Sequence, residues 1–189
     1  MNITSVLIVG VGGQGSLLTS RILGTFALEL GLDVKVSEVH GMAQRGGSVV
    51  TYVRMGDNVA SPIIEEDGAD YMLSFELLET LRSIKLMKKD GKIVVNSQEI
   101  DPMPVIIGAQ EYPENISEAI AKKVETHFVD AVPIANELGN VRFVNTVMIG
   151  KLAAIMGHDK EKWINAIRQC VPEKTVDMNI EAFEKGYNL

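Results

Sequence analysis

The residues with the clearest chemical meaning are glycines near the start of the chain, Gly10, Gly12 and Gly15. Their spacing, G-x-G-x-x-G between an apolar run and a helical run, is typical of the first turn in a dinucleotide-binding fold. Glycine permits the tight turn, lets an anion approach bare backbone, and lets the helix pack near the strand. Free N–H groups at the helix start would favour negative charge there. We therefore predict that Gly10, Gly12, Gly13, Gln14 and Gly15 contact an anionic ligand or cofactor.

From the residues alone, this glycine turn has three interpretations. It can serve strand–helix packing and hold no ligand, it can contact an anion or cofactor, or it can bind NAD as a substrate. An NAD enzyme needs an acidic residue at the end of the second strand, and Glu38 lies near that place. No residue pair suited to hydride transfer accompanies Glu38, so NAD turnover is the least favoured interpretation. We predict no catalytic residue and no metal site in this chain.

A second glycine-rich loop follows the second expected strand and ends in Gln44, Arg45, Gly46 and Gly47. The Arg45 guanidinium can donate two hydrogen bonds to a phosphate or carboxylate, and the glycines leave backbone N–H groups accessible. These four residues are the second predicted anion contact. The alternative is that Arg45 pairs with an acid such as Glu38 and only holds the loop.

Two other reactive side chains are interpreted as structural. His40 adjoins the second loop and could donate to an anion, but a structural histidine is the favoured interpretation. Cys170 is the single cysteine and lies in an apolar helical run, so we expect it in the core. A lone cysteine also excludes an internal disulfide, a cysteine-held iron–sulfur cluster and a structural zinc site.

The two glycine-rich segments together resemble a known family. Gly-Val-Gly-Gly-Gln-Gly at 10–15 and the stretch 37–49, with His-Gly-Met-Ala-Gln-Arg-Gly-Gly inside it, resemble the small subunit of indolepyruvate:ferredoxin oxidoreductase. That subunit is similar to the gamma subunits of the 2-oxoacid:ferredoxin oxidoreductases. The resemblance runs almost end to end and includes residues 143–150 and the closing helix at 175–187. The second stretch is closer to the indolepyruvate branch than to the pyruvate or 2-ketoglutarate branches.

The resemblance implies a subunit of an enzyme that catalyses oxidative decarboxylation. In the family, an aryl-2-oxo acid, coenzyme A and oxidised ferredoxin give an aryl-acetyl-coenzyme A, carbon dioxide and reduced ferredoxin. Thiamine diphosphate and the [4Fe–4S] clusters belong to the large subunit. The present chain would then bind no cofactor tightly and be inactive alone, with the large subunit and, through the complex, ferredoxin as partners.

Under the same resemblance, the glycine turn and the second loop lie toward the thiamine diphosphate or the coenzyme A side of the complex. The isolated chain could form a homodimer. The alternative hypothesis is an independent Rossmann-like module that binds a nucleotide, a flavin or coenzyme A.

Composition limits the class of protein and its partners. The chain has 189 residues, is 46% hydrophobic and carries a formal net charge of −7, so we predict a single domain over 1–189. The acidic balance argues against nucleic acid as a partner. No apolar run reaches the length of a membrane span, and the N-terminus lacks the basic region of a signal peptide. We therefore predict a cytoplasmic location and no membrane partner.

Alternating periodicities predict the elements that position the two glycine segments. The fold class is α/β, a Rossmann-like, mostly parallel sheet with helices on both faces and a helical C-terminal segment from about 140. Strands are expected at 6–9, 33–39, 49–55, 70–75, 92–96, 103–107 and 128–132, with a turn at 89–91. Helices are expected at 16–30, 77–84, 113–124, 133–138, 141–156, 159–171 and 176–187.

Two of these helices carry more specific predictions. Asn115 and Glu118 have the spacing of a capping box at the start of the helix at 113–124. The helix at 141–156 has little polar face, so it is either central in the fold or a subunit contact. Asn145 interrupts its apolar surface and needs a hydrogen-bond partner if it is buried.

Overall fold

The glycine turn follows β1 (Ile3–Val11), which lies inside the sheet rather than at its edge. The computed structural model describes residues 3–41 and 46–189. In these ranges one six-stranded sheet has the order β2-β3-β1-β4-β5-β6. Its other strands are β2 (Asp33–His40), β3 (Ser48–Gly56), β4 (Ala69–Ser74), β5 (Met87–Asn96) and β6 (Glu125–Val129).

Most of the sheet is parallel. β1, β4, β5 and β6 pair in parallel, whereas β3 runs antiparallel to both β1 and β2. Because two reversals restore the direction, β2 points the same way as β1. The predicted mostly parallel α/β sheet is therefore confirmed. It departs from a doubly wound sheet in one respect: β2 and β3 form a hairpin, and β3 separates β2 from β1.

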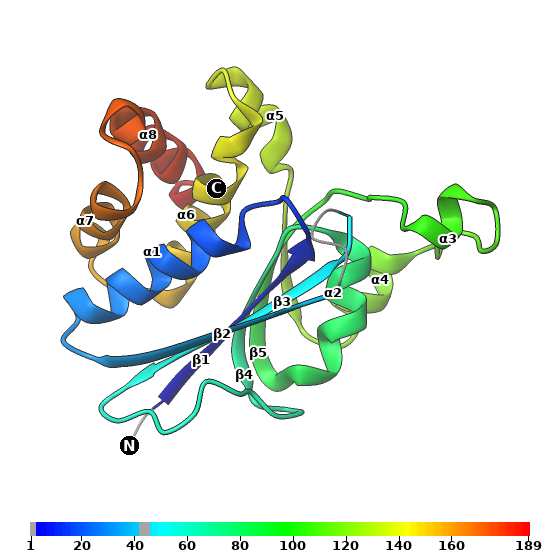
Figure 1. Cartoon of the computed structure of the whole chain (residues 1–189), viewed down its shortest axis with the longest axis horizontal. Coiled ribbons are helices and arrows are strands. Elements are labelled where there is room, and N and C mark those ends of the chain that lie inside the picture. Colours follow the sequence, from blue (N-terminus) through cyan, green and yellow to red (C-terminus); the bar gives the residue numbers. More distant parts are fainter. Residues whose placement is uncertain (1–2, 42–45) are drawn as a thin grey trace.

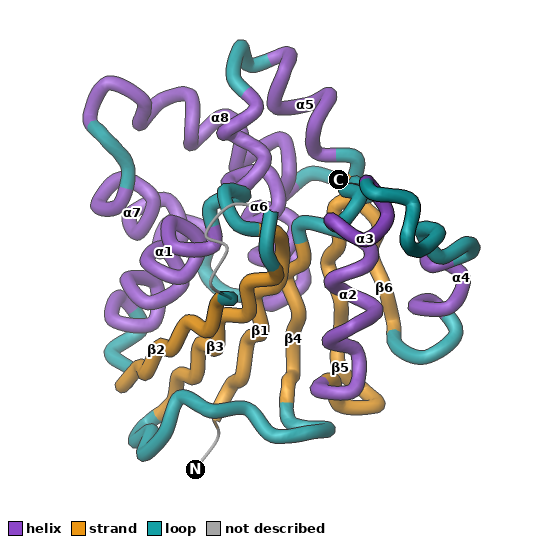
Figure 2. Tube along the Cα trace, turned by 45° about the vertical axis from the view of Figure 1, so that its right-hand side comes forward, coloured by secondary structure: helices purple, strands orange, loops and turns teal. Residues whose placement is uncertain are grey.

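Helices cover both faces of the sheet, as predicted. Figure 2 shows α1, α6, α7 and α8 on one side and α2 and α4 on the other. The helices are α1 (Ser16–Glu29), α2 (Leu77–Ser83), α3 (Met103–Ile106), α4 (Ile116–Ala121), α5 (Ala131–Glu137), α6 (Val144–Met156), α7 (Lys160–Cys170) and α8 (Val176–Tyr187). Short 3-10 turns lie at Ile84–Leu86, Val141–Phe143 and Glu173–Thr175. Among the residues that the structure describes, no helix is long and apolar enough to cross a membrane.

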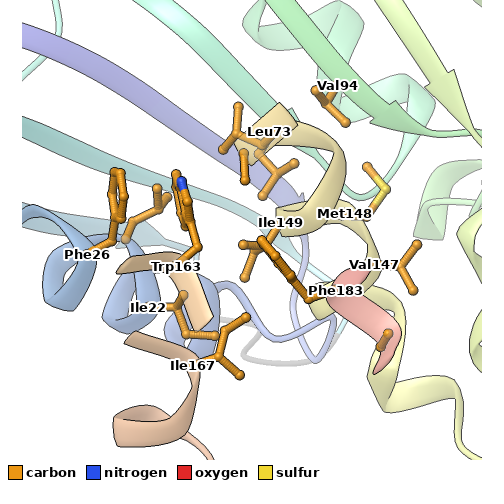
Figure 3. Close-up of a cluster of buried hydrophobic side chains, with 14 of the residues drawn as sticks. Ile22, Phe26, Leu73, Val94, Val147, Met148, Ile149, Trp163, Ile167 and Phe183 are labelled. Atoms are coloured by element: carbon orange, nitrogen blue, oxygen red, sulfur yellow. The ribbon is translucent and has the colours of Figure 1, made fainter. Parts of the chain in front are cut away.

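β1 supplies side chains to two cores, because successive residues of a strand point to opposite faces. Val6 and Ile8 pack in the core under α1 and α6–α8, and Leu7 and Val9 pack in the core under α2 and α4. The first core is drawn in Figure 3, where residues of α6 and α8 lie together with side chains of α1 and α7.

α6 is a core helix. Val147, Met148, Ile149 and Leu152 have no exposed surface, and the helix packs between the sheet and α8 (Figure 1). Of the two interpretations of the apolar run at 141–156, burial in the chain's own core accounts for α6. Asn145 is 7% exposed and has the hydrogen-bond partner that such burial requires, described below.

The segment at 103–107 is not the predicted strand. Met103–Ile106 forms the short helix α3, and no residue of α3 is buried. Proline has no N–H to donate to a sheet, but it is tolerated in the first turn of a helix. Pro102 and Pro104 therefore disfavour a paired strand here and permit a helical turn.

Other features of the fold also differ from the sequence predictions. α4 begins at Ile116, and Asn115 adopts a left-handed conformation (φ 57°) without a side-chain cap, so the predicted capping box is wrong. β6 spans Glu125–Val129 instead of the predicted 128–132, and the chain enters α5 directly after it. The predicted turn at 89–91 lies inside β5, next to an irregularity in its pairing with β4.

Candidate functional site

The glycine turn follows the carboxyl end of β1. Parallel α/β folds bind ligands at the carboxyl ends of their strands. Gly15 is the N-cap of α1 with φ 88°, and no side chain caps the helix. Gly13 has φ 103°, and a Cβ atom added there would meet no atom within 4 Å. The first N–H groups of α1 and the open face of Gly13 are therefore available to an anion.

The second loop meets the glycine turn through the backbone. The N–H of Gly12 donates to the carbonyl of Gly47 (N···O 2.8 Å), and the N–H of Gly46 donates to the carbonyl of Gly12 (3.3 Å). Antiparallel pairing of β1 with β3, with Val11 opposite Ser48, brings the two segments together. Gln44 and Arg45 lie outside the described residues, so their contact with an anion stays a prediction.

A first cleft of about 350 Å³ lies between the turn and the end of β2. Its lining is Gly12, Gly13, Gly15, Ser16, Leu17, Glu38, His40 and Val49. One carboxylate oxygen of Glu38 accepts hydrogen bonds from the hydroxyls of Ser16 and Thr51, each at 3.0 Å. Glu38 thus ties the first turn of α1 to the hairpin, and it gives this cleft a negative wall.

His40 is exposed at the rim of this cleft. Its Nδ1 atom lies 3.0 Å from the carbonyl oxygen of Gly41. That contact is local, within one residue.

A second cleft of about 420 Å³ opens on the other side of the turn, toward the start of α6. Its lining is Gly13, Gln14, Gly15, Leu18, Gln98, Ile100, Val141, Arg142, Val144 and Asn145. Arg142 is exposed and gives this cleft a positive group. The Asn145 amide donates to the carbonyl of Gly15 (3.5 Å), so α6 touches the N-cap of α1.

Sequence reasoning missed Arg142 and the second cleft. Asn140, which accepts a hydrogen bond from the Arg142 backbone N–H (3.0 Å), is a cap-type residue immediately before an apolar helix. Asn140 and the apolar run after it indicated that a helix starts here. What they could not indicate is that this start lies beside a turn some 130 residues earlier in the chain.

Gln14 and Gly10 shape the turn from inside. The Gln14 side chain accepts from the N–H of Val11 (2.7 Å) and donates to the carbonyl of Phe75 (3.1 Å) and to Gln98 Oε1 (3.2 Å). A Cβ atom on Gly10 would lie 2.8 Å from Gln14 Oε1. Both residues therefore have a role within the chain, and their contact with a ligand stays a prediction.

A buried polar cluster lies behind the turn, around Glu76 at the start of α2. Glu76 is 1% exposed, and its carboxylate accepts from the N–H groups of Glu79 (2.8 Å) and Ile100 (3.1 Å) and from the Tyr112 hydroxyl (2.6 Å). Burial and the hydrogen bond to Glu76 raise the pKa of Tyr112 well above its usual value. Nowhere in 3–41 or 46–189 do three or more His, Cys, Asp or Glu residues form a group that could hold a metal ion.

Comparisons with known proteins match nearly the full length of this chain. The model of the family "Pyruvate ferredoxin/flavodoxin oxidoreductase" matches residues 5–189. The indolepyruvate oxidoreductase subunit IorB of Pyrococcus horikoshii is 43% identical, and the match covers 96% of this chain and 93% of that protein.

Two solved structures have a similar fold. The pyruvate oxidoreductase subunit PORC from Thermotoga maritima superposes with a TM-score of 0.75 at 23% identity, over 100% of this chain and 97% of that one. The 2-oxoglutarate:ferredoxin oxidoreductase from Magnetococcus marinus, with 2-oxoglutarate, coenzyme A and succinyl-CoA bound, gives a TM-score of 0.73 at 18% identity. That match covers 100% of this chain but 31% of the other, so the same fold also occurs as part of a longer polypeptide.

Proposed function

The chain belongs to the pyruvate ferredoxin/flavodoxin oxidoreductase family, and we propose that it is the non-cluster subunit of an oxidoreductase for indolepyruvate and other aryl pyruvates. The reaction is oxidative decarboxylation to the aryl-acetyl-coenzyme A, with reduction of ferredoxin. The observation that carries this proposal is the 43% identity to an indolepyruvate oxidoreductase subunit over nearly the full length of both chains.

The division of labour between subunits is taken from the family, and the lone cysteine of this chain agrees with it. With one cysteine, the chain cannot hold an iron–sulfur cluster of its own. We therefore assign the clusters and thiamine diphosphate to a large partner subunit, in the cytoplasm, and ferredoxin is reached through that complex. Thiamine diphosphate supplies the carbanion chemistry, and the small chain contributes position and charge.

We assign the anionic group of coenzyme A or of the diphosphate to the glycine turn. The residues fit such a group because the start of α1 has uncapped N–H donors and Gly13 is open. Of the two clefts, the second is the better anion site, since Arg142 adds positive charge there whereas Glu38 adds negative charge to the first. Arg45 is the second cation that we assign to the contact between the glycine turn and the anionic group.

A pair of matched variants tests the role of the turn. Gly13→Ala places a methyl group in the open space beside the clefts, and Gly31→Ala does the same at the far end of α1; both positions have a positive φ and no neighbour within 4 Å of the added Cβ. The two variants should lose similar stability from backbone strain. In the reconstituted complex, only Gly13→Ala should raise the KM for coenzyme A or weaken thiamine diphosphate binding. Equal kinetics for the two variants would contradict the assignment.

Arg45→Ala tests the second loop in the same assay. Loss of one charged hydrogen bond should weaken coenzyme A or thiamine diphosphate binding by roughly 1.5–3 kcal/mol without unfolding the chain. Unchanged rates and affinities would return Arg45 to a structural role.

The function itself is tested by reconstitution with the large subunit. Ferredoxin reduction should require both chains, and the rate with indolepyruvate should exceed the rate with pyruvate or 2-oxoglutarate. A small chain that binds NAD or FAD tightly and turns over alone would overturn the proposal in favour of an independent module.

A further inference from the structure

The segment between β5 and α4, residues 97–115, forms an arm that reaches outward from the sheet (Figure 1). α3 lies on this arm. Met103, Ile106 and Ile107 at its tip are 65%, 64% and 68% exposed, and no residue of α3 is buried. Large apolar side chains gathered on one exposed turn are typical of a surface that contacts another molecule.

The arm is anchored at both of its ends. Oε1 of the buried Glu76 accepts hydrogen bonds from the N–H of Ile100 (3.1 Å) and from the hydroxyl of Tyr112 (2.6 Å). Gln98 adds a second anchor, since its carbonyl accepts from the N–H of Leu77 (3.0 Å). The chain thus leaves the molecule and returns to it at one carboxylate, which holds the apolar tip away from the protein's own cores.

The charges on the arm indicate what would cover the tip. Residues 102–110 carry no charge, and on either side lie the exposed acids Glu99, Asp101, Glu111 and Glu114, with no lysine or arginine from 97 to 115. A complementary surface is an apolar pocket with a basic rim. A second copy of this chain is a poor match, because the chain carries a net charge of −7.

The position of the arm indicates which partner has that pocket. Gln98 and Ile100 at its base also line the second cleft. A protein that brings an anionic cofactor to this cleft would therefore lie next to the arm. We propose that the arm tip docks into an apolar, basic-rimmed pocket on the large subunit. This inference rests on the proposed function, because it takes its partner from there.

The test is the affinity of the full chain for the large subunit. Ile106→Glu and Ile107→Glu, alone and together, place charge in the proposed pocket, and the double variant should weaken association roughly ten-fold or more. Leu28→Glu is the matched control, since Leu28 is 64% exposed on α1, away from the arm, and it should bind like wild type. Circular dichroism and thermal melting of each variant establish that the fold is retained, and Ile106→Ser with Ile107→Ser is a milder second pair.

The outcomes separate this inference from the proposed function. If the wild-type chain does not bind the large subunit, the proposed function fails. If wild type binds and the arm variants bind equally well, or if Leu28→Glu weakens binding as much as they do, the docking inference fails while the function stands. Sedimentation of the isolated chain covers the remaining occupant: a dimer that the arm variants dissociate would identify a second copy and overturn the inference.

Discussion

Among single residues, two glycines of the motif, Gly10 and Gly15, have other atoms of the chain close beside them. A Cβ on Gly10 would approach Gln14, and a Cβ on Gly15 would lie 2.0 Å from the Asn145 amide. Packing alone therefore accounts for glycine at these two positions. Gly13, outside the strict motif, has both a positive φ and open space beside it. A ligand that needs bare backbone would find it at Gly13. Substitution of Gly13 is therefore the most direct test of the site.

Tyr112→Phe should destabilise the protein by about 1–3 kcal/mol, because it removes a donor from the buried Glu76 carboxylate. The effect should depend on pH. Since the pKa of Tyr112 is raised in the folded protein, its stabilisation is complete below the ordinary tyrosine pKa of 10.0 and is lost as pH rises from there toward the folded pKa. Urea unfolding of wild type and variant at neutral and strongly alkaline pH measures both effects.

Tyr71→Phe is the control for this prediction. Tyr71 is half-buried in β4, and its hydroxyl has no hydrogen-bond partner in the described part of the chain. The control should therefore change stability little. If Tyr112→Phe and Tyr71→Phe lose the same stability at neutral pH, the hydrogen bond from the Tyr112 hydroxyl to Glu76 does not stabilise the fold.

At the scale of elements, glycines let α6 and α8 approach closely where they cross. A Cβ on Gly150 would lie 2.1 Å from the carbonyl oxygen of Phe183, and a Cβ on Gly186 would lie 1.9 Å from that of Val147. The two helices thus meet backbone to backbone. The buried hydrogen bond from Thr146 to Asn179 (2.7 Å) lies in the same contact.

Gly186→Ala should force α6 and α8 apart and destabilise the protein by about 1–3 kcal/mol or more, because the atoms it meets are backbone atoms that cannot rotate away. Thermal or urea unfolding measures the loss. Gly24→Ala in α1 is the control, since nothing lies within 4 Å of its added Cβ; it should be neutral or stabilise by about 0.5–1 kcal/mol through helix propensity. A Gly186→Ala protein as stable as wild type would contradict this account of the crossing.

Local patterns in the sequence predicted the elements well where one periodicity dominates. The helix at 176–187 and the glycine turn are where the pattern placed them, because apolar spacing and turn chemistry agree there. The exposed α3 was missed because Val105, Ile106 and Ile107 resemble a buried strand, and only the surrounding prolines indicated otherwise. Arg142 was missed because its place beside the glycine turn depends on packing between distant elements, which no local pattern records.

At the scale of the whole molecule, the two cores share the strands of one sheet. Each face of the sheet has its own core, and the C-terminal helices belong to one face only. Val6 to Val9 of β1 contribute to both cores in alternation. We therefore infer that residues 1–189 form a single domain in which loss of either core removes support from the shared strands.

Trp163 allows a direct test, because it is the single tryptophan, has no exposed surface, and stacks on Phe26 with ring centroids 3.6 Å apart. Its fluorescence reports on the core under α1 and α7, and far-UV circular dichroism reports on the whole chain. Unfolding curves from the two probes should coincide. Separate transitions would mean that the helical C-terminal segment unfolds as its own unit.

A substitution in the opposite core makes this test stricter. Ile120 on α4 has no exposed surface and packs under the other face of the sheet, so Ile120→Ala should destabilise the chain by about 2–5 kcal/mol. In a single cooperative domain, the midpoint seen by Trp163 should fall as far as the midpoint seen by circular dichroism, although Ile120 and Trp163 lie on opposite sides of the sheet. If the Trp163 transition keeps its wild-type midpoint, the two faces unfold independently and the sheet does not couple them.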